Sequence, residues 1–102
     1  MNHQAEPSLG RHMEPLVAIS IVHLSPCTRQ RLADGALSVI AYPNDYGGFV
    51  YVDPQGEHTP QEPELAALLT LARRAGVIWI KFDADADVVD GVAVFDNIGE
   101  AP

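Results

Sequence analysis

The order of short apolar runs along the chain is the feature that most limits its fold. β-branched and aromatic residues concentrate in residues 16–24, 37–42, 49–52 and 77–82. Such runs are typical of strands buried on at least one face, and the first is apolar enough to be a central strand. The segments between the runs carry helix or turn signals. The sequence therefore predicts an α+β fold with the order β-α-β-β-α-β, which matches the ferredoxin-like antiparallel sheet with two helices on one face.

Two segments carry the end signals of helices. Ser25 and Pro26 suit the N-cap and the first helical position, which predicts a short helix that ends just before Gly35. A longer helix is expected from near Glu62 to just before Gly76, because leucines and alanines recur there on one helical face. The residues of this face are Leu65, Leu68, Leu69, Ala72 and Ala75.

Turn formers connect the remaining elements. Residues 43–48 read Pro-Asn-Asp-Tyr-Gly-Gly and predict the turn of a hairpin between the second and third runs. Near the C-terminus, an Asp-Gly pair lies between β-branched residues in the stretch 88–94. This pattern predicts a tight hairpin, and with it a short C-terminal β appendix to the sheet.

Length limits the chain to one domain, since 102 residues bury only about two thirds of the surface of the unfolded chain. We expect residues 1–15 to be a flexible leader, residues 16–98 a single α+β domain and residues 99–102 a tail. No run approaches the roughly 18 apolar residues that span a bilayer, and the single Cys27 has no partner for an internal disulfide. A cytoplasmic protein without membrane contact is expected.

Acidic residues are concentrated in this chain, whose formal net charge is −8. Residues 32–71 contain six carboxylates and no Lys or Arg, and residues 82–102 contain six more, again without a base. A field of this sign repels nucleic acid and anionic membranes and speeds encounter with basic protein surfaces. The expected partner is therefore a basic protein, with no direct binding of nucleic acid.

The acids that follow the last apolar run raise the possibility of a metal site. Asp83, Asp85 and Asp87 alternate and are followed by Asp90, so they could gather oxygen ligands for calcium or magnesium. The run begins like the calcium loop of an EF-hand but lacks the Gly at its sixth position and the Glu at its twelfth. A solvated acidic loop is the plainer interpretation, and no metal site is predicted.

The chain displays no catalytic constellation. Cys27 lies in the first turn of a predicted helix and His23 is close in sequence, but this spacing is weak support for a nucleophile and its base. Gly47 and Gly48 lack the flanking residues of a phosphate-binding loop. We therefore expect no enzyme activity, no catalytic residues and no cofactor.

Aromatic residues form a second candidate surface. Trp79 and Lys81 alternate with residues expected to face the helices, so they point to the open face of the sheet, and Phe49 and Tyr51 share one face of the neighbouring strand. Open-face aromatics are typical of RNA-recognition modules, but those also need basic residues that this chain lacks. A patch for a protein partner or a second copy of the chain is one interpretation, and cover by the C-terminal segment is the other.

Two sequence blocks carry a resemblance to a known family. Residues 42–50 (YPNDYGGFV) and 79–83 (WIKFD), with shorter matches at 89–91 and 94–96, resemble the signature of a small uncharacterised bacterial family. The resemblance extends over about residues 17–96. That family is met on plasmids, phages and integrative elements, often near antirestriction genes. The resemblance implies a mobile-element setting and supplies no activity and no catalytic residues.

These observations lead to one favoured hypothesis and two alternatives. The favoured function is an anti-CRISPR or antirestriction inhibitor that occupies the basic surface of a host nucleic-acid-targeting defence complex with DNA-mimicking carboxylates. The alternatives are a regulatory interaction module that uses the aromatic sheet face, and a metal-dependent enzyme that uses the cluster from Asp83 to Asp90. The residues expected to bind the partner are Asp83, Asp85, Asp87, Asp90, Asp45, Asp53 and Trp79.

Overall fold

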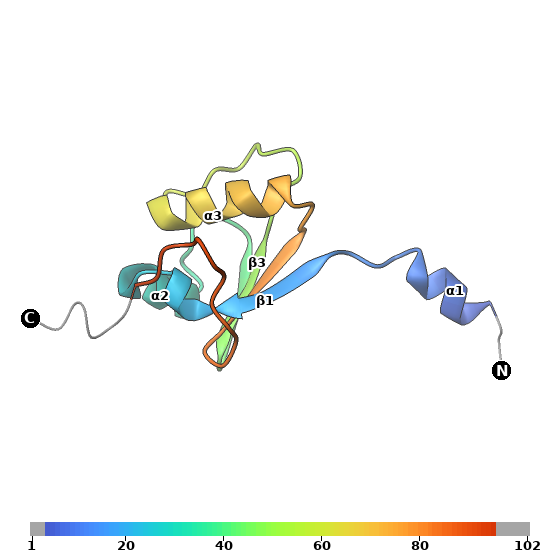
Figure 1. Ribbon diagram of the computed structural model, residues 1–102, viewed down its shortest axis with the longest axis horizontal. Coiled ribbons are helices and arrows are strands. Elements are labelled where there is room, and N and C mark those ends of the chain that lie inside the picture. Colours follow the sequence, from blue (N-terminus) through green and yellow to red (C-terminus); the bar gives the residue numbers. More distant parts are fainter. Residues whose placement is uncertain (1–3, 96–102) are drawn as a thin grey trace, which may run out of the picture.

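The computed structural model describes residues 4–95 and contains a four-stranded sheet with helices against one face (Figure 1). The mixed α+β class predicted from the sequence is confirmed. The elements, in chain order, are α1 (Ala5–Gly10), β1 (Leu16–Ser20), the 3-10 turn η1 (Ile21–His23), α2 (Pro26–Ala33), β2 (Ala41–Asn44), β3 (Gly47–Tyr51), α3 (Pro63–Arg74) and β4 (Trp79–Asp83).

The strands lie in the order β1-β4-β3-β2, with β1 parallel to β4 and the other neighbours antiparallel. The sheet is therefore mixed, and the ferredoxin-like antiparallel order expected from the sequence is not found. Burial explains the difference. Ile80 and Phe82 of β4 are fully enclosed, which suits a central strand, whereas Leu16 and Ala18 of β1 are exposed, which suits an edge.

The first apolar run is only partly a strand, so the prediction of a central strand over residues 16–24 is wrong. β1 stops at Ser20, whose hydroxyl accepts a hydrogen bond from the backbone N–H of Val22 (3.2 Å) and caps η1. The rest of the run turns under the helices, where His23 and Leu24 are buried. Its apolar residues therefore fill the core rather than extend the sheet.

The hairpin is tighter than the sequence suggests. Asn44 pairs with Gly47, so the turn consists of Asp45 and Tyr46 alone, and residues 37–40 are not part of a strand. Gly47 is required by close packing, because a Cβ there would lie 2.0 Å from the carbonyl oxygen of Phe82 on β4. The glycines predicted to form the turn therefore belong to β3 and allow it to pair closely with its neighbours.

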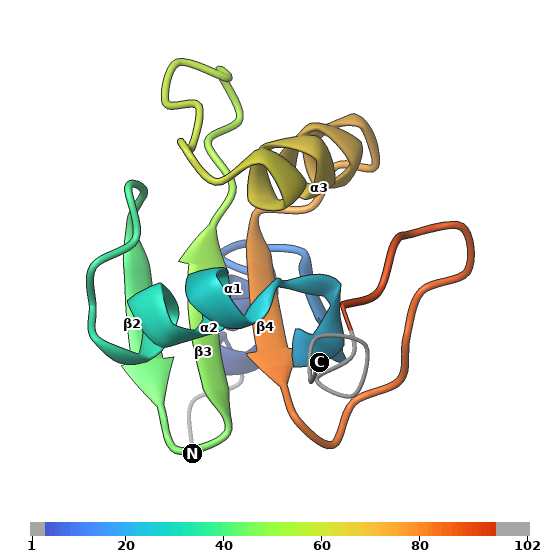
Figure 2. The same ribbon diagram turned by 90° about the vertical axis from the view of Figure 1, so that its left-hand side faces the viewer.

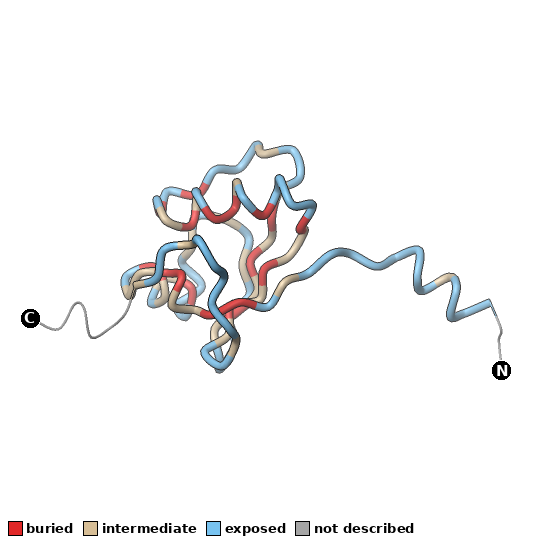
Figure 3. Tube along the Cα trace, viewed as in Figure 1, coloured by how far each residue is buried: buried red, intermediate tan, exposed pale blue. Residues whose placement is uncertain are grey.

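The core lies between the sheet and two helices on the same face (Figures 1 and 2). Both helices match their predicted positions, and the hydroxyl of Ser25 accepts a hydrogen bond from the Thr28 N–H at the start of α2. Buried residues recur along α2, α3 and the strands, whereas α1 has none (Figure 3). The buried apolar residues of the core include Leu24, Leu32 of α2, Leu65, Leu68, Leu69 and Ala72 of α3, Val50, Ile80 and Phe82 of the sheet, and Val52.

The segment after β4 forms no strand within residues 84–95, so the predicted hairpin and β appendix at 88–94 are wrong there. His23 explains the alternative conformation. Its Nδ1 donates to the carbonyl of Ala93 (2.9 Å) and its Nε2 accepts from the N–H of Val89 (2.8 Å). Together with a bond from the Phe95 N–H to the Val22 carbonyl (2.6 Å), these contacts hold the segment as a long loop against η1.

The leader stands away from the domain (Figure 1). α1 has no buried residue, and the leader meets the sheet through Pro15, whose carbonyl accepts hydrogen bonds from the N–H groups of Ile78 and Trp79 (3.0 and 3.2 Å). None of the helices within residues 4–95 has the length and apolar character that crossing a bilayer requires. Residues 96–98 of the predicted domain and the predicted tail lie outside the described range.

Candidate partner-binding site

The strand register decides which side chains share the open face of the sheet, meaning the face away from α2 and α3. Trp79 pairs with Tyr51 on one side and Leu16 on the other, and Lys81 pairs with Phe49. Directly paired residues project to the same face. No helix within residues 4–95 covers this face (Figures 1 and 2). The larger side chains on it are Leu16, Tyr42, Phe49, Tyr51, Trp79, Lys81 and Asp83.

Three of these side chains gather at one end of the open face, and we call Tyr42, Tyr51 and Trp79 the aromatic trio. The Trp79 ring centroid lies 5.2 Å from that of Tyr51 and 6.1 Å from that of Tyr42, with the ring planes tilted by 58° and 41°. Tyr42 is 58% exposed, and the other two rings are half-buried. The indole N–H of Trp79 donates to Oε1 of Glu14 (3.0 Å), which fixes the orientation of the ring.

Carboxylates gather at the other end of the same sheet, at a place we call the acidic end, formed by Asp45, Asp83 and Asp85. The hairpin turn that carries Asp45 contacts the segment after β4, because the Tyr46 carbonyl accepts a hydrogen bond from the Ala84 N–H (2.9 Å). Asp45 and Asp85 are exposed. This contact brings the turn that carries Asp45 next to Asp83 and Asp85, which are neighbours in the sequence.

Asp83 is more engaged than its neighbours in the acidic end. Its Oδ1 accepts a hydrogen bond from the N–H of Asp85 (2.8 Å), and its Oδ2 lies 3.7 Å from Nζ of Lys81. Its side chain is half-buried, so it shapes the turn as well as adding charge. Asp87 continues from this turn with an exposed side chain, and its carbonyl accepts from the Ser20 N–H (2.9 Å).

Asp90 lies in a different place, beside an apolar groove of about 450 Å³ between α3 and β1. Leu68 and Leu71 line the groove from α3, Val17 lines it from β1, and Val89 lines it from the long loop. In Figure 2 this loop, drawn in orange to red, extends away from the end of β4 toward the level of α3. The alternating acids of the sequence are therefore spread along the loop.

Asp53 follows β3 at the end of the sheet where the aromatic trio lies. Its carboxylate accepts hydrogen bonds from the N–H groups of Gln55, Glu57 and His58 and from the His58 ring (2.9–3.2 Å). The bond from the His58 ring is the main cause that lowers the pKa of Asp53, and the backbone bonds act in the same direction. Asp53 is therefore an ionised residue that organises its own loop.

A second set of carboxylates joins α3 to the rest of the domain. Glu62 is only 6% exposed, and its Oε1 accepts a hydrogen bond from the Ser38 hydroxyl (2.7 Å). Its Oε2 lies 3.0 Å from Nε of Arg31, so the two side chains form an ion pair, although the geometry is not that of a hydrogen bond. Burial raises the pKa of Glu62, but the hydrogen bonds to its carboxylate, chiefly the one from the Ser38 hydroxyl, together with the charge of Arg31 outweigh burial, so the pKa is lowered. Glu64 accepts a hydrogen bond from the Ser25 N–H (2.8 Å). Partial burial raises its pKa, but the hydrogen bonds from Ser25 and Thr28 together outweigh burial, so the pKa is lowered.

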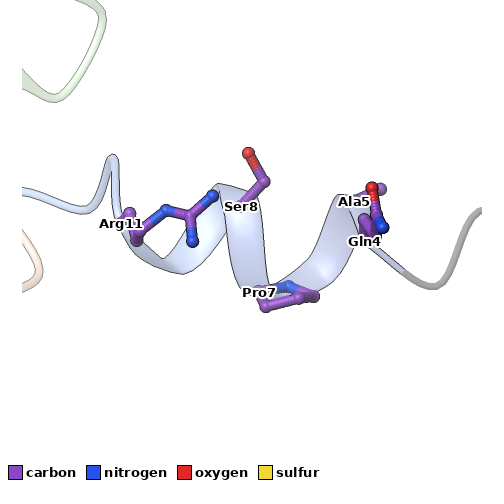
Figure 4. Close-up of a pocket in the computed structure, with 5 residues that line it drawn as sticks. All are labelled: Gln4, Ala5, Pro7, Ser8 and Arg11. Carbon is purple, nitrogen blue, oxygen red and sulfur yellow. The ribbon is translucent and has the colours of Figure 1, made fainter.

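The metal-site alternative and the pair of Cys27 and His23 gain no support from the described residues. Among residues 4–95, no three His, Cys, Asp or Glu side chains are grouped so that they could hold a metal ion. Cys27 is exposed on α2, whereas both ring nitrogens of His23 are used by the long loop. The hollow on α1 is lined by residues of the leader alone, and their side chains point in different directions (Figure 4).

Tyr42, a member of the aromatic trio, and Glu14 beside it are not predicted from the sequence. A strand over residues 37–42 does not indicate that Tyr42 pairs with Phe49. Glu14 lies in the leader, where no local pattern indicates contact with the sheet. Alternation with buried residues, by contrast, indicates that Trp79 lies on the open face and that Phe49 and Tyr51 share one face of their strand, and the register shows that these faces coincide.

The fold and the open face define a small α+β domain with an aromatic surface on one side of its sheet. A family model matches the chain from the first residue of β1 onward. Residues 16–97 match the model described as "Family of unknown function (DUF5983) C-terminal domain", which covers most of the chain, so the chain belongs to that family. No curated protein and no solved structure matches the chain.

Proposed function

We propose that this chain is a small acidic protein that binds a basic protein partner through the open face of its sheet. The observation that carries this proposal is the aromatic trio, which lies together and partly exposed on a face that no described helix covers. Contiguous exposed apolar surface on a small domain is typical of an interaction site. Tyrosine and tryptophan are also the residues most enriched at the centres of such sites.

Charge supports a basic partner. The formal net charge is −8, and the acidic end borders the open face at the side opposite the aromatic trio. A basic surface would be drawn toward this field and would meet aromatic rings and carboxylates on one side of the sheet. The proposal therefore combines two expectations from the sequence: that the aromatic face of the sheet makes the contact, and that the partner is a basic protein.

A more specific form of the proposal concerns the setting of the interaction. The resemblance of residues 42–50 and 79–83 to a mobile-element family favours an inhibitor of a host nucleic-acid-targeting defence complex, of the anti-CRISPR or antirestriction kind. Its support from geometry is the convergence of Asp45, Asp83 and Asp85, whose carboxylates could stand in for phosphates on a basic groove. The test of this form is competition between the chain and DNA for the purified complex.

The general proposal is tested with partner proteins recovered from the native host on a tagged chain and then purified for direct binding measurements. Trp79→Leu and Tyr42→Leu should each weaken binding of the true partner by about tenfold or more, as expected for residues at the centre of an interface. Asp45→Asn with Asp85→Asn should weaken it mainly at low salt.

The matched control removes two charges elsewhere, with Glu6→Gln and Glu57→Gln. Both side chains are exposed, and neither belongs to the acidic end or the open face. The proposal fails if the purified partner binds the Trp79 and Tyr42 variants as tightly as it binds the unchanged chain. The inhibitor form alone fails if the partner is unrelated to nucleic acid.

A further inference from the structure

We infer that the aromatic trio, together with Glu14, is a receptor for the positively charged head of an arginine side chain presented by the partner. This inference rests on the proposed function and adds the chemistry of recognition. A cation is attracted to the face of an aromatic ring when it lies within about 6 Å of the ring centroid, and tryptophan attracts it most strongly. Three such rings lie together here, with Trp79 in contact with both tyrosines.

The tilt of the rings and the exposure of Tyr42 are compatible with a bound cation. The planes of Tyr42 and Tyr51 are tilted against that of Trp79 by 41° and 58°, so the three rings are not stacked flat against one another. The 58% exposure of Tyr42 leaves its ring open to solvent. An incoming planar guanidinium can stack on one ring while its edge is directed to a carboxylate, which a compact ammonium cannot do.

Two carboxylates border the trio and complement a cation. Glu14 accepts the indole N–H of Trp79 with one oxygen, and its second oxygen receives no hydrogen bond from a residue in the range 4–95. Asp53 lies on the Tyr51 side, where both residues line the same groove. Its lowered pKa keeps it charged at neutral pH, although its oxygens are used within its own loop. Glu14 therefore supplies the direct partner, and Asp53 adds to the field.

The adjoining groove offers a place for the rest of an arginine side chain and its flanking residues. It has a volume of about 260 Å³ and continues from Tyr51 along Ile40, Val39 and Leu37. The aliphatic part of an arginine side chain packs readily against such apolar groups while its head stays at a polar site. The Tyr51 N–H donates to the Ile40 carbonyl (3.0 Å), which fixes the wall of the groove to β3.

Lys81 is the one cation of the described residues on the strands of this face, and its position is compatible with the inference. It lies two residues along β4 from Trp79, which corresponds to about 6.6 Å of strand. Its Nζ lies 3.7 Å from Asp83, at the acidic end. Lys81 is therefore directed away from the trio and partly neutralised there.

The experiment uses the full chain labelled with ¹⁵N and the probe N-acetyl-arginine amide, with N-acetyl-citrulline amide as the neutral probe of nearly the same shape. The chain has a single tryptophan, so its indole N–H resonance reports on the trio without ambiguity. The arginine probe should shift this resonance in a saturable way, with an affinity about tenfold higher than that of the citrulline probe. The amides of residues 42 and 51 should shift with the same midpoint.

Variants separate the contributions. Tyr42→Leu keeps an apolar side chain on an edge strand but removes one ring, and Glu14→Gln keeps size but removes the charge; each should weaken arginine binding several-fold. Tyr46→Leu, which removes an exposed ring at the hairpin turn outside the trio, should leave it unchanged. Trp79→Phe should retain part of the affinity, and a folded Trp79→Leu chain should lose it.

The inference is overturned if the citrulline probe binds as well as the arginine probe, or if the shifts map to Asp85 and Asp87 rather than to the trio. It is also overturned if Tyr42→Leu and Glu14→Gln bind arginine normally. The proposed function is judged separately, by binding of the purified partner. If that partner is lost with Trp79→Leu but free arginine does not bind the trio, the open face is the interface and recognition uses another chemistry.

Discussion

Replacement of Leu65 by alanine tests how the core is built around α3. Leu65 is fully buried between the helix and the sheet. Removal of three carbons costs about 0.8 kcal/mol each in lost transfer free energy, about 2.4 kcal/mol in total. The cavity left in a rigid core brings the loss of unfolding free energy to between about 2.5 and 5 kcal/mol. A domain of this size is stabilised by only about 5–15 kcal/mol, so this loss is large.

Leu71→Ala is the matched control, because it makes the same chemical change on the same helix at a position that is 49% exposed. It should cost about 1 kcal/mol or less. Urea unfolding followed by circular dichroism measures both variants, and the midpoint for Leu65→Ala should fall by about 1 M or more with an unchanged slope. Equal losses for the two variants would refute the placement of α3 on the sheet.

Two further predictions concern the packing and the charges of the same fold. Gly47→Ala would place its Cβ 2.0 Å from the Phe82 carbonyl, so we expect a loss of about 1–3 kcal/mol or more in urea unfolding, whereas Gly10→Ala, with nothing near its Cβ, should be neutral. The hydrogen-bonded carboxylates of Asp53, Glu62 and Glu64 have pKa values lowered by folding, so their stabilisation is present above the pKa of the unfolded chain, about 4, and is lost as the pH falls through the folded values. Unfolding free energy should therefore decline on acidification below about pH 4.5, and Glu62→Gln should flatten that decline; an unchanged pH dependence would contradict the role of Glu62.

The helices were predictable because their signals are local. Ser25, Pro26 and Gly35 mark α2 in the sequence itself, and the apolar face of α3 repeats within one element. The strand order was not predictable, since it depends on which strands gain most from having a neighbouring strand on each edge. The fate of residues 84–95 was also hidden, because His23, about 70 positions away, supplies the hydrogen bonds that hold them.

Only the part of the candidate site that depends on local sequence patterns could be predicted. Alternation predicted that Trp79 lies on the open face and that Phe49 and Tyr51 share a face of the neighbouring strand. The register, which the sequence did not supply, pairs Tyr51 with Trp79 and sets Gly47 opposite Asp83, which brings Asp45 to the acidic end. The hydrogen bond from Trp79 to Glu14 of the leader could not be predicted, because no sequence pattern indicates that the two residues meet. The number of acidic residues in a stretch does not show which carboxylates can reach a partner. The Asp53 carboxylate accepts hydrogen bonds from its own loop, whereas Asp85 is exposed.

The central claim is that the open face of the sheet is the surface that binds a basic partner. The most direct measurement is the footprint of the purified partner on the ¹⁵N-labelled chain, mapped by amide shifts and by the indole N–H of Trp79. The account predicts that the footprint covers Tyr42, Tyr51, Trp79 and the acidic end, and that it shrinks as salt rises. A footprint on the exposed side of α3 around Leu71, with the Trp79 indole unmoved, would contradict it.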